Sequence, residues 1–312
     1  YIRRFNMSIY DLIAISVIVC HNGLMHSDDV LAAAFLSSVF RMLNHPFTIK
    51  RMNGKEANKY ANNPAYLIFD VGGGRYDHHD KKHMKYREGC NAYVENGFPY
   101  AAFGLLWKDF GKSYLTEVFK AQTGKNPPDS LVEKFFREFD RKYVSVIDSR
   151  DNNGPKIASN LSDAITAMNG RTPCDANFMA AVAWSQIAFD AWINSTINAM
   201  EDEQELNEAL NNLSNDALVL ELEHHLKLSG GVHEKCPNLH YVIYPSIRDE
   251  GYWNITALAD GANKTICPFI PDASKYKDVS FVHTSGFMAV CKSKEAAINA
   301  CLQNEKLHEK SE

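Results

Sequence analysis

The 312-residue chain lacks several common functional motifs. Its seven cysteines form no CxxC pair, which excludes a zinc ribbon and a dithiol redox motif, and their odd, scattered distribution favours a reducing compartment. The run Gly72-Gly73-Gly74 is not followed by GK[ST], so it is not a Walker A nucleotide loop. Internal repeats and low-complexity tracts are absent, and a compact globular fold is therefore expected.

The chain also lacks a basic excess and a long apolar run. Its formal net charge is −5, unlike that of a protein that binds nucleic acid through bulk positive charge. The apolar run Leu12–Cys20 is too short to span a bilayer and has no signal-peptide cleavage site. We therefore expect a cytoplasmic protein without a membrane partner. A phosphate substrate is still compatible with the acidic balance, because divalent cations supply local positive charge.

Alternating strand-like and helical patterns in the first part of the chain predict an α/β fold. Apolar residues 15–20 predict a strand buried on both faces of a parallel sheet, and the Ala/Leu/Phe-rich residues 30–43 predict a helix on that sheet. Residues 47–51 and 66–71 predict further strands. The order strand, helix, strand, strand is typical of a sheet covered by helices.

The second part of the chain predicts a long helix followed by a smaller α/β region. Residues 177 to about 228 contain no internal proline or glycine, and we expect a helical region that breaks near Ser195 or Asp202 and ends at Gly230-Gly231. Two strands, residues 240–244 and 254–258, and a helix over residues 294–307 follow. We expect a catalytic domain at 1–170, a helical linker at 171–230 and a C-terminal domain at 231–312.

Two polar clusters follow predicted strands. His21, His26, Asp28 and Asp29 come after the first strand, and the stretch Asp77-His78-His79-Asp80 comes after the strand that ends near Asp70. Because sites in open α/β sheets form outside the carboxyl ends of the strands, the two clusters predict one composite site. The full set of candidate metal ligands is His21, His26, Asp28, Asp70, Asp77, His78, His79 and Asp148.

The residue types in these clusters indicate a divalent metal site. Carboxylates with some imidazole suit Mn²⁺ or Mg²⁺, with Co²⁺ or Zn²⁺ as alternatives. Asp70 is the expected bridge between two metals, which together would generate a hydroxide and clamp a phosphoryl oxygen. Arg75 is either a phosphate contact or a solvated loop residue. Asp151 and Asn152 either support the site or cap a turn, and His224-His225 is expected on the exposed face of a charged helix.

These residues occur in an order that resembles the DHH superfamily of phosphoesterases, and within it the melanocyte-proliferating-gene (MYG) exonuclease family. The motifs that carry the resemblance are His21…His26-Ser27-Asp28, Asp70-Val71-Gly72-Gly73, Asp77-His78-His79, Val146-Ile147-Asp148-Ser149-Arg150-Asp151-Asn152, Tyr244-Pro245 with Trp253, and Phe281-Val282-His283-Thr284-Ser285-Gly286-Phe287. Cys20 departs from the pattern, because the family more often has threonine there. The resemblance covers nearly the whole chain.

The resemblance implies a two-domain DHH phosphoesterase-like fold with a metal-containing cleft. It implies a metal-dependent phosphodiesterase that trims single-stranded RNA or short oligonucleotides in the 3′→5′ direction, with two divalent ions, Mn²⁺ first. A hydrolase of a small phosphoanhydride or cyclic dinucleotide and a non-catalytic nucleic-acid-binding protein are the alternatives. A homodimer is left open.

The resemblance also implies a role for each matched residue. His21, His26 and Asp70 would hold one metal, and Asp28, Asp70, His78 and Asp148 the other. Asp77 would orient the histidine pair, and His79 would face the scissile phosphate. His283, with Ser285 and Gly286, would bind substrate phosphate from the second domain.

Overall fold

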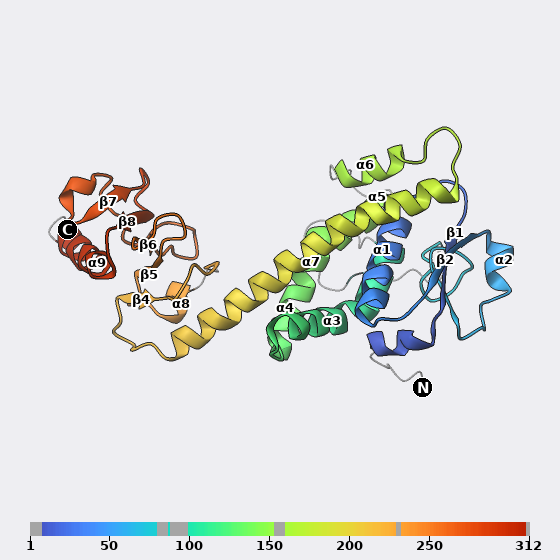
Figure 1. Cartoon of the computed structure of the whole chain (residues 1–312), viewed down its shortest axis with the longest axis horizontal. Helices are drawn as coiled ribbons and strands as arrows, with labels where there is room; N and C mark the ends of the chain where they lie inside the picture. Colours follow the sequence, from blue (N-terminus) through green and yellow to red (C-terminus); the bar gives the residue numbers. More distant parts are fainter. Residues whose placement is uncertain (1–7, 80–86, 88–98, 153–159, 229–231, 310–312) are drawn as a thin grey trace. The chain divides into compact units, whose positions relative to one another are not determined.

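The computed structural model describes residues 8–79, 87, 99–152, 160–228 and 232–309. The chain divides into two compact units, residues 1–200 and residues 201–312. The division falls inside helix α7 (Asp175–Asn211), which Figure 1 shows as one long, unbroken helix. The two units are described separately.

The first unit contains a small parallel sheet covered by helices. In chain order its elements are η1 (Ile9–Ala14), β1 (Val17–His21), α1 (Ser27–Met42), β2 (Thr48–Met52), α2 (Gly54–Asn58), β3 (Tyr66–Ile68), α3 (Ala102–Thr123), α4 (Asp129–Phe139), the π-helical turn η2 (Asp140–Val144), α5 (Ser145–Asp151), α6 (Asn160–Ala167) and the first part of α7. β1 pairs in parallel with both neighbours in the order β2-β1-β3. The predicted α/β class and parallel sheet are confirmed.

Helix α1 lies at the centre of this unit. Every residue from Val30 to Leu36 is buried, and the Phe35 ring contacts Trp107 of α3 and Phe189 of α7 at centroid distances of 5.4 and 5.6 Å. A helix that is apolar on all sides must be covered on all sides. Its first turn, Ser27 to Asp29, is therefore buried too, which brings two carboxylates into the interior.

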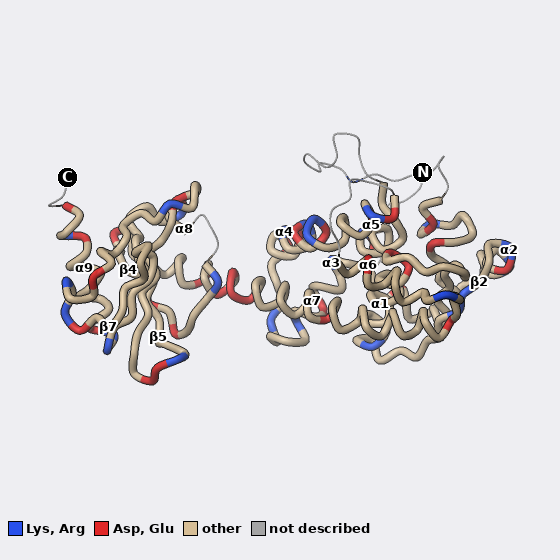
Figure 2. Tube along the Cα trace, turned by 90° about the horizontal axis from the view of Figure 1, so that it is seen from above, with Lys and Arg blue, Asp and Glu red and all other residues tan. Residues whose placement is uncertain are grey.

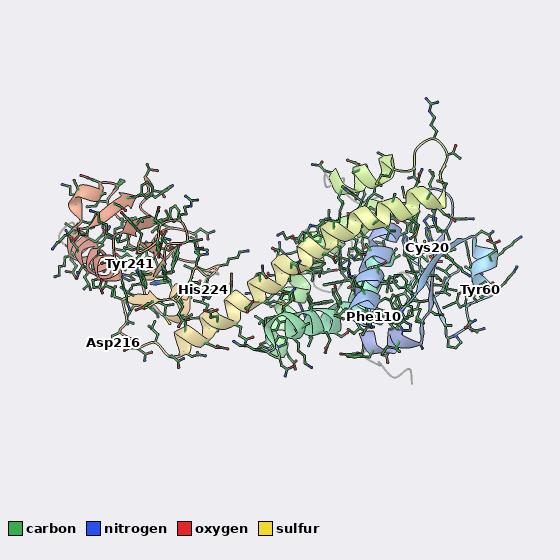
Figure 3. The ribbon with its side chains drawn as sticks, viewed as in Figure 1. Cys20, Tyr60, Phe110, Asp216, His224 and Tyr241 are labelled. Atoms are coloured by element: carbon green, nitrogen blue, oxygen red, sulfur yellow. The ribbon has the colours of Figure 1, made fainter. Side chains whose placement is uncertain are left out.

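The second unit is a mixed five-stranded sheet with a helix on one face. Its elements are the end of α7, β4 (Val219–Glu221), α8 (Val232–Lys235), β5 (Tyr241–Pro245), β6 (Trp253–Ala257), η3 (Ala273–Lys275), β7 (Val279–Val282), β8 (Met288–Cys291) and α9 (Lys294–Glu309). The strand order is β4-β5-β6-β8-β7, with β4–β5 parallel and the other pairs antiparallel. α9 packs on the face that carries Tyr241, labelled in Figure 3.

The long helical region differs from its prediction. α7 has no break near Ser195 or Asp202, and it ends at Asn211 instead of extending towards residue 228. Residues 219–221 form strand β4, and His224 lies in an irregular exposed segment rather than on a helix (Figure 3). Leu220 and Leu222 are buried on either side of exposed Glu221, so an alternating strand pattern was present.

Helix α7 supplies core residues to both units. Phe189 and Ile193 lie in the core of the first unit, and Leu206 and Leu210 lie in an apolar cluster of the second. Residues 171–230, which were expected to form a linker, thus contribute side chains to the cores of both units. Gly230-Gly231 lies outside the described residues. Within the described ranges, no helix has the length and apolar character needed to cross a membrane.

Candidate metal centre

The carboxyl-terminal edge of the parallel sheet brings the two polar clusters together. His21 is the last residue of β1, and Asp70 follows β3 after a parallel bridge between Phe69 and Tyr76. Because β1 and β3 are parallel neighbours, their ends meet, and His21 Nε2 lies 3.2 Å from Asp70 Oδ2. Asp29, in the first turn of α1, lies 3.1 Å from the same nitrogen.

A glycine-rich turn brings the chain back to the same edge. Asp70 itself has a left-handed backbone (φ 56°), and Gly72 and Gly73 follow with φ 85° and 73°. The Gly73 N–H donates to Asp77 Oδ2 at 2.6 Å, while Asp77 Oδ1 accepts from the His79 N–H and lies 2.8 Å from His79 Nδ1. Asp77 therefore holds the turn and the His79 ring in place. Asp80 lies outside the described residues.

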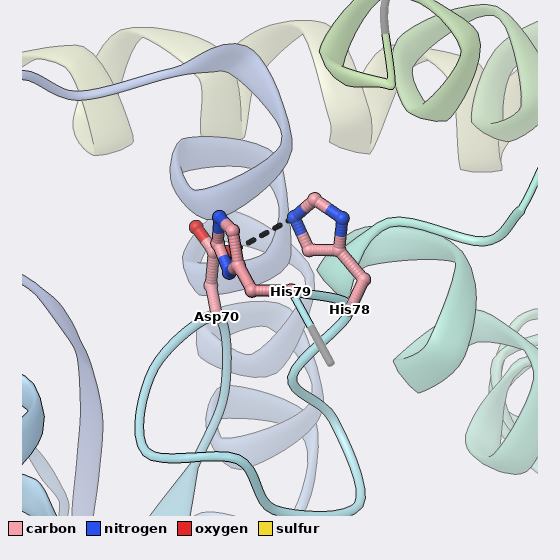
Figure 4. Close-up of side chains that lie close together, drawn as sticks. All are labelled: Asp70, His78 and His79. Atoms are coloured by element: carbon pink, nitrogen blue, oxygen red, sulfur yellow. Dashed lines mark ion pairs between the residues drawn. The ribbon is translucent and has the colours of Figure 1, made fainter. Parts of the chain in front are cut away.

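Among the residues that the structure describes, three groups of side chains have possible ligand atoms within 4.8 Å of one another: Asp70, His78 and His79; His21, Asp29 and Asp70; and His26, Asp28 and Asp151. Asp70 belongs to two of them, as expected of a bridging carboxylate. Figure 4 shows the rings of His78 and His79 beside the Asp70 carboxylate. The dashed line marks an ion pair between His78 and Asp70.

His78 connects the groups. Its Nε2 lies 3.0 Å from Asp70 Oδ1, 3.1 Å from Asp151 Oδ2 and 3.6 Å from Asp28 Oδ2. Its Nδ1 lies 3.3 Å from the side-chain oxygen of Asn152, which only accepts hydrogen bonds, so this contact assigns the proton to Nδ1. Nε2 is then available to a metal. The end of α5 supplies both Asp151 and Asn152.

The donor atoms at this edge fit a bound cation. Among the described residues, six buried atoms at this edge make no hydrogen bond, and five of them contact one another only as histidine–carboxylate ion pairs: Nε2 of His21, Oδ1 of Asp28, Oδ2 of Asp29, both carboxylate oxygens of Asp70, and Nε2 of His78. Buried polar atoms are nearly always satisfied, and buried carboxylates are strongly destabilising unless paired or metal-bound. Oxygen ligands with imidazole suit Mn²⁺ or Mg²⁺. Metal binding would satisfy all six atoms.

The pKa values of Asp28, His21 and His78 are all raised, because several buried carboxylates lie close together. Burial raises the pKa of Asp28 well above its usual range, and the nearby carboxylates of Asp70 and Asp151 raise it further. Burial disfavours the charged form of His21, but Asp29 and Asp70 outweigh it and raise the His21 pKa to about 11. Asp70 and Asp151 likewise raise the pKa of His78 to about 9 against the effect of burial. In the metal-free protein these histidines act as the counter-ions.

Asp148 is not part of any of these three groups. Its Oδ2 lies 2.5 Å from Nη2 of Arg87, and its Oδ1 accepts from the Gly104 N–H at 3.1 Å. Asp151, one helical turn further along α5, has the position beside His78 instead. Asp29 and Asp151 belong to these groups, although the ligand assignment from the sequence did not include them. Both were visible in the sequence, next to Asp28 and in the D-x-x-D spacing, respectively.

His26 belongs to the third ligand group and is half-exposed immediately before α1, with its Nδ1 3.5 Å from Asp151. The predicted substrate contacts lie outside the three groups. Arg75 pairs with Asp109 at 2.7 Å. In the second unit, His283 Nδ1 lies 2.9 Å from the Ser285 hydroxyl, and Gly286 (φ 73°) packs so tightly on Phe269 that a Cβ would lie 2.4 Å from its carbonyl oxygen. The substrate roles of Arg75, His283, Ser285 and Gly286 stay predictions.

The two aspartates of α5 can be separated by experiment. We expect Asp151→Asn to weaken Mn²⁺ binding at least about tenfold, because it removes a carboxylate from the ligand groups. Asp148→Asn should leave the affinity nearly unchanged, because Asp148 contacts Arg87 instead. Isothermal titration of the metal-free proteins measures both constants. A large loss for Asp148→Asn with none for Asp151→Asn would restore the original assignment.

The fold and the site define a class of protein: an α/β protein with carboxylate and imidazole groups that could hold metal ions at the C-terminal edge of a parallel sheet. The family model MYG1_exonuc, described as "Uncharacterised protein family (UPF0160)", matches residues 17–266, so the chain belongs to this family.

Two curated proteins are similar to part of the chain. The MYG1 exonucleases of Mus musculus and Homo sapiens are each 26% identical over 138 residues, which is 42% of this chain and 34% of the relative. The match thus spans about a third of the length of these relatives. A solved structure, the pGpG-specific phosphodiesterase PggH from Vibrio cholerae, aligns over 96% of this chain and 98% of that chain at 13% identity. Its TM-score of 0.26 is too low to support an argument.

Proposed function

We propose that the protein is a metal-dependent phosphodiesterase, an exonuclease that trims single-stranded RNA or short oligonucleotides from the 3′ end. The observation that carries the proposal is the convergence of buried carboxylate and imidazole groups around Asp70, in a chain that is similar to proteins named exonucleases. Two divalent ions, Mn²⁺ first, are the proposed cofactors.

The ligand groups support an assignment of residues to two ions. His21, Asp29 and Asp70 would hold one, and Asp28, Asp70, His78 and Asp151 the other, with His26 on the solvent side. Two ions bound there supply Lewis acidity towards a phosphoryl oxygen and lower the pKa of a water nucleophile. His21 and His78 must be neutral to bind metal, so metal binding at neutral pH releases protons.

His79 is the proposed contact of the chain with the scissile phosphate. Its side chain is 57% exposed, whereas those of its neighbours His78 and Asp77 are largely buried. The contact with Asp77 holds Nδ1 and leaves Nε2 to donate to a phosphate oxygen when the ring is protonated. Asp77 acts through His79 and is a positioning residue.

Digestion of end-labelled oligonucleotides tests the proposal. We expect 5′-labelled single-stranded RNA to give a ladder that shortens from the 3′ end with Mn²⁺, and no products with EDTA or with His78→Ala. A matched control is His224→Ala, an exposed histidine outside the ligand groups, which should cleave normally. Hydrolysis of pyrophosphate or of a cyclic dinucleotide without trimming would replace the exonuclease proposal. No turnover of any of these substrates would contradict a catalytic role.

A further inference from the structure

The loop that joins β1 to α1 carries members of the ligand groups at both of its ends. His21 precedes this loop, residues 22–26, and His26 is its last residue. Backbone groups outside helices and strands need other hydrogen-bond partners where they are shielded from water. In this loop those partners include two buried side chains from distant parts of the sequence, Arg51 and Asn169.

Arg51 holds the first half of the loop. It lies on β2 directly beside Cys20 of β1, and its side chain is only 4% exposed. Figure 2 shows the basic residues of β2 in blue. The Arg51 Nε donates to the His21 carbonyl oxygen at 3.1 Å, and its Nη2 donates to the Gly23 carbonyl oxygen at 3.0 Å. One edge of a planar guanidinium thus holds two carbonyls of the same turn, and the single nitrogen of lysine does not have this forked geometry.

The carbonyl between these two orients the His21 ring. The Asn22 carbonyl oxygen lies 2.9 Å from His21 Nδ1 and only accepts hydrogen bonds, so this contact assigns a proton to Nδ1. The other ring nitrogen, Nε2, faces Asp29 and Asp70 and is the atom left for a metal. A contact of this kind commonly fixes the tautomer and orientation of a metal-binding histidine. Because Arg51 holds the carbonyls on either side, it fixes the ring through the backbone.

Asn169 holds the second half of the loop. It lies in the turn after α6 and is 6% exposed. Its Oδ1 accepts from the Met25 N–H at 2.8 Å, and its Nδ2 donates to the Met25 carbonyl oxygen at 2.9 Å. One amide side chain therefore pairs with both backbone groups of Met25, as a neighbouring strand would. Since Met25 directly precedes His26, the pair also fixes the point from which α1 begins.

The start of α7 supports both side chains. The Phe178 ring lies against the Arg51 guanidinium, with its centroid 4.5 Å from Cζ, and Phe178 is fully buried. Asn177 Nδ2 donates to the Asn169 carbonyl oxygen at 3.1 Å. Asp175, 3.6 Å from Arg51 Nη1, is largely exposed and adds little. Helix α7 thus holds the two residues from the side opposite the loop that they bind.

We propose that Arg51 and Asn169 are positioning residues of the metal centre, which hold residues 22–26 in the shape that binds an ion. They act through the backbone of the loop and not on the ion itself. The inference deepens the proposed function and rests on it for the presence of the ions. Without these side chains the loop carbonyls would lose their donors, and His21 would no longer be preorganised for the ion.

Titration of the metal-free full chain with Mn²⁺ in a calorimeter tests the proposal. We expect Arg51→Met, which keeps most of the side-chain length without its donors, to weaken Mn²⁺ binding at least about tenfold. Arg51→Lys keeps the charge without the fork, and the affinity should stay reduced. Asn169→Leu should also weaken binding. Arg41→Met removes an arginine that pairs with Asp190 outside the ligand groups, and this matched control should bind normally.

The visible absorption of bound Co²⁺ distinguishes positioning from a loss of stability. The Co²⁺ bands depend on the number and geometry of the ligands, so a displaced His21 should change their intensity in Arg51→Met at saturating Co²⁺. A substitution that only lowers the unfolding free energy leaves the spectrum of the folded protein unchanged. Circular dichroism checks that each variant is folded. Full Mn²⁺ affinity in Arg51→Lys would overturn the role of the fork.

The outcomes separate this inference from the exonuclease proposal, because the metal titration uses no substrate. Parent affinity and an unchanged Co²⁺ spectrum in folded Arg51→Met and Asn169→Leu proteins would overturn the positioning roles and leave the activity intact. Weakened metal binding in both variants, with no cleavage of any substrate by the parent protein, would overturn the activity and leave the positioning roles. A parent protein that binds neither Mn²⁺ nor Co²⁺ would overturn the positioning roles.

Discussion

Asp70→Asn is expected to lower turnover by about 10³-fold or more while the protein keeps its fold. Asp70 is the residue shared by two of the ligand groups, and its two buried oxygens contact His21 and His78. An amide has one oxygen acceptor and no charge, so it cannot bridge two cations. Metal ions bound there would stabilise the transition state by several kcal/mol. Loss of about 4 kcal/mol of that stabilisation corresponds to a rate about 10³-fold lower.

The backbone conformation at residue 70 is one that asparagine adopts readily, so the substitution should not disturb the fold. Asp70 has φ 56°, in the left-handed region that asparagine tolerates better than most residues. Urea denaturation and circular dichroism should therefore show a folded protein, and steady-state cleavage with saturating Mn²⁺ should show the loss. Asp278→Asn is the stability control, since Asp278 has φ 59° and is exposed. Normal turnover in a folded Asp70→Asn protein would refute the bridging role.

Arg87→Met is expected to destabilise the first unit by about 3–5 kcal/mol at pH 8. The Arg87 guanidinium is buried between Asp140, at 2.8 and 3.0 Å, and Asp148, at 2.5 Å. Asp148 has no solvent exposure. Removal of the guanidinium would leave this carboxylate buried without its cation, whereas methionine keeps most of the volume. Urea denaturation of parent and variant measures the difference in unfolding free energy.

The loss should be smaller at acidic pH. Burial raises the pKa of Asp148 to about 6, although Arg87 opposes the shift. A carboxyl group whose pKa is higher in the folded state adds stability below its unfolded pKa and loses it as pH rises through the folded value. Without Arg87 the folded pKa rises further, so the deficit grows from pH 5 to pH 8. A pH-independent deficit would argue against an ionised Asp148.

Two control variants show whether the effect belongs to the buried pair. The double variant Arg87→Met/Asp148→Leu should recover much of the lost stability, because no buried charge remains. Arg137→Met removes an exposed arginine that pairs with Glu133, and it should leave the unfolding free energy nearly unchanged. An equal loss in the single and double variants would mean that packing at residue 87, and not the charge of Asp148, causes the effect.

The first strand and the helix after it were predictable because both contain long apolar stretches. The predicted strand at residues 15–20 is observed at Val17–His21, and the helix at residues 30–43 is observed at Ser27–Met42. The end of α7 was missed although Ser214, Asn215 and Asp216 are poor helix formers, because the prediction relied on the absence of proline and glycine. Strand β4 forms there because Leu220 pairs with Val242 of β5, a tertiary contact that local propensity does not contain.

Most members of the ligand groups could be identified from the sequence, but the sequence did not show which aspartate of α5 belongs to them. His21, Asp28, Asp70 and His78 are in the ligand groups because the ends of parallel strands meet at one edge. Asp148 and Asp151 are one helical turn apart, so spacing alone does not decide between them. The difference depends on Arg87 and on Gly104, where a Cβ would lie 1.8 Å from Asp148 Oδ2. No motif connects these residues to Asp148.

The continuity of α7 links the folding of the two units. Its intrahelical hydrogen bonds continue past Met200, where the contacts divide, and its side chains fill both cores. A fragment cut at residue 170 would lack Phe178 and Phe189, and one that begins at residue 231 would lack Leu206 and Leu210. Fraying that starts in one unit would remove side chains from the core of the other. We therefore expect the two units to unfold together, although their contacts divide at Met200.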